Sequence, residues 1–299
     1  MSEMLQYEFM RIALVMAVLI GLTAPAVGTF IVQRKLSLLG DGIGHIALTG
    51  IGLGLLTSTS PVLGALVVSV LGAVAIEFLR ARSRSGADVA LALLFYGGLA
   101  GGVMLTNAQG GGTSLQSYLF GSISSVSASD LYVVAGLAVV VLAIVAVFGR
   151  ELFLLCQDEE VARAAGLPVR FLSILIAATA AVTVVISMRA IGLLLVSALM
   201  IVPVAAAQQV TRGFRSTMLL AMAAGVLSAV TGLVGSFEYD LPPGPSIVLL
   251  ALAVFVVAVI GGAVVRRRRA RAQAEPGRAE PSGARAATTR EAEAEVLGG

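Results

Sequence analysis

A carboxylate and an imidazole stand four residues apart in a strongly apolar part of the chain. The segment is GDGIGHIALTG, residues 40–50, which contains Asp41 and His45, the only histidine. On an α-helix, residues i and i+4 share one face, with Cβ atoms about 6 Å apart. Carboxylate oxygen and imidazole nitrogen both bind Zn²⁺ and Mn²⁺, so this spacing predicts a metal site at Asp41 and His45.

Two interpretations of this pair stay open at this point. In one, Asp41 and His45 satisfy each other as a structural pair; in the other, they bind a transported ion. An ionisable residue near the bilayer midplane costs a few kcal/mol and persists only with a partner or a function. One chain supplies two ligands, whereas a two-fold dimer would supply two aspartates and two histidines. Such a sparse site binds weakly, which suits a transporter that must release its ion.

The composition indicates that the bilayer is the solvent of this chain. Of its 299 residues, 58 % are hydrophobic and 12 % are charged, whereas soluble domains are about half apolar and a quarter charged. Several uncharged runs approach the ~20 residues that cross the hydrocarbon core as a helix. We therefore expect an all-α, polytopic membrane protein with about nine spans, although eight or ten remain possible. The expected spans are 8–32, 37–56, 61–79, 88–106, 131–149, 171–188, 191–209, 216–236 and 246–265.

Basic residues between the spans predict the topology. Arg266, Arg267, Arg268 and Arg269 follow the last span and place the C-terminus in the cytoplasm by the positive-inside rule. Counting backwards, the cytoplasmic connections then hold Arg34, Lys35, Arg80, Arg82, Arg84, Arg150, Arg163, Arg170, Arg212 and Arg215, whereas Arg11 and Arg189 face outward. The transmembrane domain is expected over 1–265, and 266–299 has the composition of a disordered cytoplasmic tail.

Several function classes are excluded. A single cysteine, Cys156, permits no disulfide within one chain and no thiolate metal cluster. The sequence contains neither a G-x-x-x-x-G-K-[ST] phosphate loop nor an H-E-x-x-H motif. The basic residues follow membrane topology, so we expect no nucleic-acid partner. We therefore expect a non-enzymatic transport protein without a tightly bound cofactor, whose transported substrate is Zn²⁺ or Mn²⁺ and whose ATPase, if it has one, is a separate chain.

One expected cytoplasmic connection is long, and its local sequence predicts regular structure, GRELFLLCQDEEVARAAGLPVR at 149–170. Asp158 suits a helix N-cap, Glu159 and Glu160 suit the first turn, and Gly166 suits the position after the C-terminal end of the helix. The resulting helix of about two turns is too short to be stable alone. It is either an amphipathic segment packed on its own spans or a docking element for a cytoplasmic partner.

The remaining charged residues favour structural roles. Glu77 with Arg80 predicts an interfacial ion pair, and Asp88 and Asp130 begin spans as helix caps. Glu238 and Asp240, in SFEYDLPPGPS, lie in an expected external loop. They are either solvated charges or a contact for an external partner.

Residues 34–54, RKLSLLGDGIGHIALTGIGLG, resemble the signature of the membrane permeases of bacterial zinc, manganese and iron ABC importers. Further stretches match that family in order, namely SLQSYLFGSISSVSASDL, DEEVARAAGLPVR, MRAIGLLLVSALMIVPVAAA and DLPPGPS. The resemblance covers roughly residues 8–265. Gly44 and Ile46 depart from it, because the family usually has serine and alanine around the histidine.

The resemblance implies an all-helical permease that pairs with a second copy of itself and binds two ATP-binding subunits. It also implies a metal ion delivered by an extracytoplasmic binding protein, for which Glu238 and Asp240 are possible contacts. It makes Asp41 and His45 the metal-pathway residues and 150–170 the ATPase contact, including Asp158, Glu159, Glu160, Ala162 and Gly166.

These observations together predict the permease subunit of an ATP-driven importer in the bacterial cytoplasmic membrane, for zinc first and then manganese or iron. A permease for a larger metal chelate, such as a siderophore or cobalamin, is the first alternative. A cation transporter without an ATPase is the second.

Overall fold

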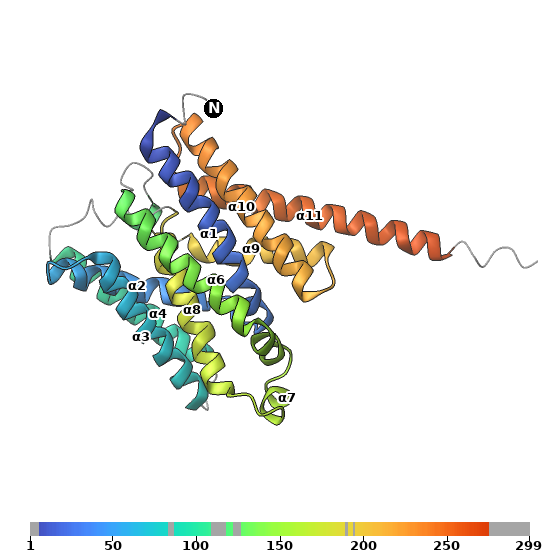
Figure 1. Ribbon diagram of the computed structural model, residues 1–299, viewed down its shortest axis with the longest axis horizontal. Coiled ribbons are helices and arrows are strands. Elements are labelled where there is room, and N and C mark those ends of the chain that lie inside the picture. The colour runs from blue at the N-terminus through green and yellow to red at the C-terminus, as the bar shows by residue number, and fades with distance from the viewer. Residues whose placement is uncertain are drawn as a thin grey trace, which may run out of the picture. The chain divides into compact units, whose positions relative to one another are not determined.

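The computed structural model describes residues 6–82, 87–108, 118–121, 127–188, 191–193 and 195–274, and their regular elements are all α-helices. In chain order these are α1 (Glu8–Gln33), α2 (Leu39–Leu56), α3 (Pro61–Arg82), α4 (Ala87–Asn107), α6 (Ala128–Gln157), α7 (Glu159–Ala164), α8 (Val169–Met188), α9 (Val196–Val210), α10 (Phe214–Glu238) and α11 (Pro243–Ala274). Figure 1 shows this all-helical arrangement, which confirms the predicted fold class.

Each predicted span coincides with one long helix of this set. Seven helices in the described part of the chain are long and apolar enough to cross a membrane. Two more, the described apolar part of α4 from Leu91 and the whole of α9, are apolar but shorter. The chain is therefore a multi-pass membrane protein, and the short α7 is an addition between two spans.

Three helix boundaries differ from the predicted ones. Helix α6 has 30 residues and ends at Gln157, so the first part of the predicted 149–170 connection is helical. Helix α9 begins at Val196 rather than 191, after a turn with Gly192 at φ 93°. Helix α11 continues to Ala274, past the expected start of the tail at 266, because arginine and alanine favour helix. Arg84, Arg189 and residues 275–299 lie outside the described residues, as do the side chains of Asp88 and Arg266 to Arg269.

Compact unit 1 covers residues 1–258, and within it small residues bring the helices together. Helix α1 packs against α6, α8, α9 and α10, while α2 packs against α3 and α4. A Cβ atom added to Gly50 of α2 would lie 2.5 Å from the carbonyl oxygen of Gly64 on α3. Glycine is therefore required there by close approach, as expected for helices packed in lipid. The second unit begins at Val259, and its described part is the helical stretch to Ala274.

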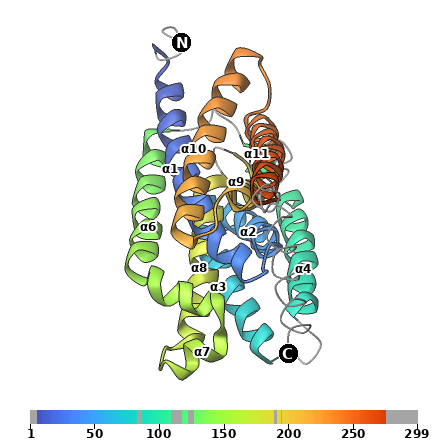
Figure 2. The same ribbon diagram turned by 90° about the vertical axis from the view of Figure 1, so that its right-hand side faces the viewer.

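Connections predicted to be cytoplasmic lie at one end of the helices of unit 1. Phe214, at the start of α10, lies with its ring centroid 5.3 Å from that of Phe30 and 4.7 Å from that of Phe153. At the opposite ends of α1 and α10, Tyr7 and Phe237 have ring centroids 6.1 Å apart. Figure 2 shows α7 at the end of α1, α6 and α8 that lies away from the start of α1. The alternation of helix directions thus agrees with the charge pattern.

Large apolar side chains cover the outward faces of several helices. Those more than half exposed include Leu63, Leu71, Val139, Val147, Leu219 and Leu249. In water such faces would be unstable, whereas hydrocarbon chains solvate them without cost. The lipid bilayer is therefore the expected partner of these surfaces.

Candidate functional site

Helix α2 carries both predicted metal ligands in its first half. The carboxylate of Asp41 accepts a hydrogen bond from the hydroxyl of Ser197. Ser197 is buried in the first turn of α9, where the positive end of the helix dipole also favours a carboxylate. A residue from the distant α9 thereby fixes Asp41.

His45 is positioned by α4 rather than by Asp41. The rings of His45 and Phe95 lie with centroids 4.1 Å apart at an interplanar angle of 64°. The backbone of α4 reaches the same point, since a Cβ added to Gly98 would lie 2.8 Å from the carbonyl carbon of His45. The imidazole is held by packing on one side of α2.

The Nδ1 atom of His45 is buried and has no hydrogen-bond partner among the described residues. A neutral imidazole carries one nitrogen lone pair, and leaving a buried polar atom unpaired costs about 1–3 kcal/mol. The structural-pair interpretation would place this nitrogen on Asp41, whose recorded partner is instead Ser197. This geometry favours the ligand interpretation of His45.

A cavity of about 350 Å³ lies beside Asp41. Its walls are formed by residues of α2 and α4 and by the residue before α2, namely Leu38, Asp41, Leu91, Ala92, Phe95 and Tyr96. Asp41 is the one ionisable acid of that lining. In the described part of the chain no group of three or more His, Cys, Asp or Glu side chains gathers in one place. One chain therefore offers a carboxylate and an imidazole, an incomplete ligand set for a cation.

Ser197 and Phe95 are two residues of this region that were not predicted from the sequence. Ser197 stands inside the matched stretch MRAIGLLLVSALMIVPVAAA, but its pairing with Asp41 spans 156 positions. Phe95 stands in an apolar run in which an aromatic residue carries no functional signal.

The predicted short helix at the other polar region is confirmed as α7. Asp158 caps it, accepting hydrogen bonds from the backbone N–H groups of Glu160 at 2.8 Å and Val161 at 3.2 Å. Ala162 is fully buried, and Gly166 ends the segment with φ 78°. Its acidic residues Glu159 and Glu160 are exposed. The outer face of α7 is therefore polar, and its inner face packs through one small apolar residue.

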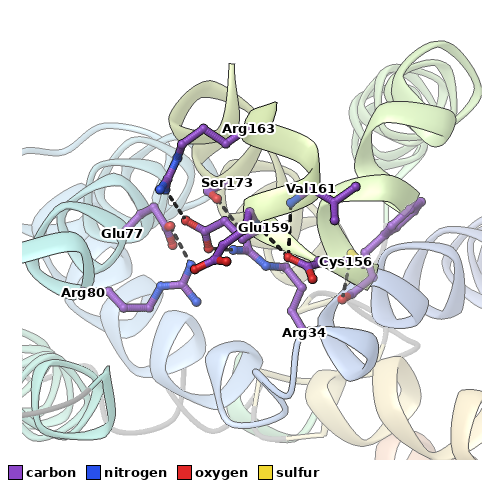
Figure 3. A network of polar contacts seen from close by, with 11 residues as sticks. Arg34, Glu77, Arg80, Cys156, Glu159, Val161, Arg163 and Ser173 are labelled. Atoms are coloured by element: carbon purple, nitrogen blue, oxygen red, sulfur yellow. Dashed lines mark hydrogen bonds and ion pairs between the residues drawn. The ribbon is translucent and has the colours of Figure 1, made fainter. Parts of the chain in front are cut away.

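A network of charges surrounds α7 (Figure 3). Arg34, directly after α1, donates to the hydroxyl of Ser173 on α8 at 2.9 Å and pairs with Glu159 at 3.5 Å. Glu159 also pairs with Arg163 at 3.2 Å. The predicted ion pair of Glu77 with Arg80 is confirmed at 2.8 Å. Burial lowers the pKa of Arg34, with repulsion by Arg80 adding to it. From the sequence, Arg34 was predicted only to lie in a cytoplasmic connection, and its contacts with α7 and α8 were not predicted.

Glu238 and Asp240 lie apart from both polar regions. Both are exposed at the end of α10, which packs beside the start of α1 through Phe237 and Tyr7. Asp240 has φ 51°, a turn conformation that aspartate tolerates better than most residues.

An all-helical, multi-pass membrane protein with a carboxylate and an imidazole on one inner helix and a short polar helix between two spans has the architecture of a transport permease. Residues 6–262 match the model of the ABC 3 transport family, and the chain belongs to this family. It is a multi-pass protein of the bacterial cytoplasmic membrane.

Relatives agree with this assignment over almost the whole chain. The manganese transport system membrane protein MntC of Halalkalibacterium halodurans is 35% identical over 86% of this chain and 88% of its own length. The manganese import system permease protein ScaB of Streptococcus gordonii is 31% identical over 84% of this chain and 90% of its own. Among solved structures, PsaBC from Streptococcus pneumoniae in complex with Fab contains a chain with TM-score 0.79 and 30% identity, covering 86% of this chain and 93% of that one.

Proposed function

We propose that this chain is the permease subunit of an ABC importer that carries Mn²⁺ across the cytoplasmic membrane. The observation that carries the proposal is the pair of Asp41 and His45 on α2, with an unpaired buried Nδ1 and a carboxylate beside a cavity. A buried carboxylate and imidazole suit a bare divalent cation. The names of two relatives support manganese as that cation.

The sequence alone ranks zinc ahead of manganese, and we reverse that order. Two aspartates and two histidines of a dimer satisfy four-coordinate zinc, whereas manganese needs further oxygens from water or hydroxyl groups. The hydroxyl of Ser197 lies on Asp41 and supplies one such oxygen next to the site. A thiolate would favour zinc over manganese, and the one cysteine of the sequence, Cys156, lies at the carbonyl oxygen of Phe30.

The permease itself catalyses no bond chemistry. Two ATP-binding subunits dock on the exposed face of α7 and its flanking residues in two copies of this chain. Hydrolysis in those subunits moves α7, and the site at Asp41 and His45 alternates between the two faces of the membrane. An extracytoplasmic binding protein delivers the ion at the opposite end, where Glu238 and Asp240 offer negative charge.

A metal chelate is the second candidate substrate. The cavity of about 350 Å³ beside Asp41 supports it, since small-molecule sites begin at roughly 300 Å³. The apolar and aromatic lining would contact the organic part of a chelate, whereas a bare cation would use only the two ligands.

The deciding experiment is radiotracer uptake by proteoliposomes that contain this chain with its ATP-binding subunits and the binding protein. Uptake of ⁵⁴Mn²⁺ is competed with Zn²⁺, Fe²⁺ and ferric chelates. We expect ATP-dependent manganese uptake that unlabelled manganese suppresses best. Suppression by the chelate alone would assign the second candidate, and ATP-independent uptake would contradict the ABC mechanism.

A further inference from the structure

The side chain of Arg34 is a cation held out of solvent where the end of α1 meets α7 and α8. Its side chain is 6% exposed, while that of its partner Glu159 is 48% exposed. A buried guanidinium persists only when acceptors replace water. Its planar fork can serve two acceptors at once. In Arg34 these acceptors belong to α8 and α7, through Ser173 and Glu159.

Helix α7 depends on this contact. A six-residue helix has no stability of its own, so its position is set by what it touches. The neighbouring end of α6 touches the same part of α1, because Gln157 donates to Gln33 at 3.5 Å and the Cys156 thiol lies 3.7 Å from the Phe30 carbonyl oxygen. The junction of α6 and α7 is therefore tied to the end of α1.

Arg34 also precedes the helix that carries the candidate metal site. It lies in the short connection between the end of α1 at Gln33 and the start of α2 at Leu39. Asp41 follows within the first turn of α2. If Glu159 moves and Arg34 moves with it, the connection between α1 and α2 moves as well, and with it the start of α2.

We propose that Arg34 is a positioning residue that links α7 to α2, so that movement of α7 changes the setting of Asp41 and the cavity beside it. This inference rests on the proposed function for the origin of that movement. In this inference the guanidinium of Arg34 binds two partners at once. Ser173 on α8 stays in place, and Glu159 on α7 moves.

The test measures the accessibility of the cavity rather than the transport of a metal ion. Leu38 is 64% exposed and lines the cavity of Asp41, so Leu38→Cys in a Cys156→Ser background reports on it through maleimide labelling. The complete complex with its ATP-binding subunits is labelled with and without a non-hydrolysable ATP analogue. We expect nucleotide to change the labelling rate by about tenfold, the scale of a typical coupling between sites.

Arg34→Gln should abolish this nucleotide response while the ATP-binding subunits still co-purify and hydrolyse ATP. Lys35→Gln is the matched control, because it removes a positive charge from the adjacent, exposed position. Arg34→Lys keeps the charge without the fork and should retain only part of the response. A full response in Arg34→Gln would overturn the proposal.

If Arg34→Gln fails to assemble, Glu159→Gln tests the same contact from the exposed side and should reproduce the loss. If the wild-type complex shows the labelling response but takes up no manganese, the assigned metal is wrong. If the wild-type complex takes up manganese and Arg34→Gln shows an unchanged labelling response, the role assigned to Arg34 is wrong.

Discussion

The two polar regions of this protein treat their charged groups in opposite ways. Around α7, Arg34, Glu159, Arg163, Glu77 and Arg80 are each joined to at least one opposite charge. On α2, Asp41 is bonded to a neutral hydroxyl and the Nδ1 atom of His45 has no partner among the described residues. Paired charges hold helices in place, whereas a carboxylate without a countercharge and an unpartnered imidazole nitrogen could accept an ion. Under the proposed function, this contrast distinguishes the region that transmits movement from the region that handles substrate.

The contrast predicts that removing the imidazole is the most damaging single change. His45→Ala should lower manganese uptake by about 100-fold or more, since even indirect disturbance of a metal ligand lowers affinity about 10–100-fold. Uptake and membrane levels are measured together. Phe95→Leu is the control, because it removes the ring beside His45 but leaves both ligands, and it should cost less. Normal uptake by His45→Ala would return the pair to a structural role.

The packing of α4 on α2 gives the next largest effect. A Cβ at Gly98 would collide with the backbone of His45 and Ile46, whereas nothing lies within 4 Å of one at Gly97. Gly98→Ala should therefore lower uptake and cost about 1–3 kcal/mol of stability. Gly97→Ala should leave both unchanged, as read by uptake and by thermal unfolding in detergent. Equal behaviour of the two variants would mean that α4 does not position His45.

A smaller effect is expected at the cap of α7. Asp158→Ala removes the acceptor for two backbone N–H groups and should destabilise the helix by about 1 kcal/mol. The expected result is weaker retention of the ATP-binding subunits during purification, with His45-dependent metal binding unaffected. Asp158→Asn should restore retention because asparagine caps equally well. Failure of asparagine to rescue would show that the negative charge matters, not the cap.

The smallest effect is expected where charge is paired but exposed. Arg163 and Glu159 form an i,i+4 pair with side chains 68% and 48% exposed. Such pairs contribute about 0.3–0.5 kcal/mol, so Arg163→Gln should leave the thermal midpoint of the complex nearly unchanged. A shift as large as that of Arg34→Gln would mean that burial does not distinguish the two arginines.

Local features of this protein follow from neighbouring residues and could be predicted. Asp158 caps α7 and Glu77 pairs with Arg80 because the partners lie within three positions. The long described helices and the shorter apolar α9 follow from runs of apolar residues, although α6 and α11 extend beyond the apolar runs. Hydropathy marks where lipid begins rather than where a helix ends, so both helices continue past the predicted spans.

The contacts that define the candidate site were not predictable in the same way. Ser197 and Asp41 are 156 positions apart, and Arg34 and Glu159 are 125 apart. No periodicity connects residues on different helices. The identity and spacing of Asp41 and His45 indicated a site, while Phe95 and Ser197 carried no signal of their own.

The sequence by itself determined that this chain lies in a bilayer as helices and that one of them carries a carboxylate and an imidazole on a single face. Hydrocarbon leaves the backbone no partner except itself, and helical geometry places i and i+4 together. Only the tertiary structure decided that Asp41 bonds to α9, that His45 rests on α4 and that Arg34 pairs with Glu159 of α7. Those pairings depend on which helices pack together, and close packing through small residues sets them across the whole chain.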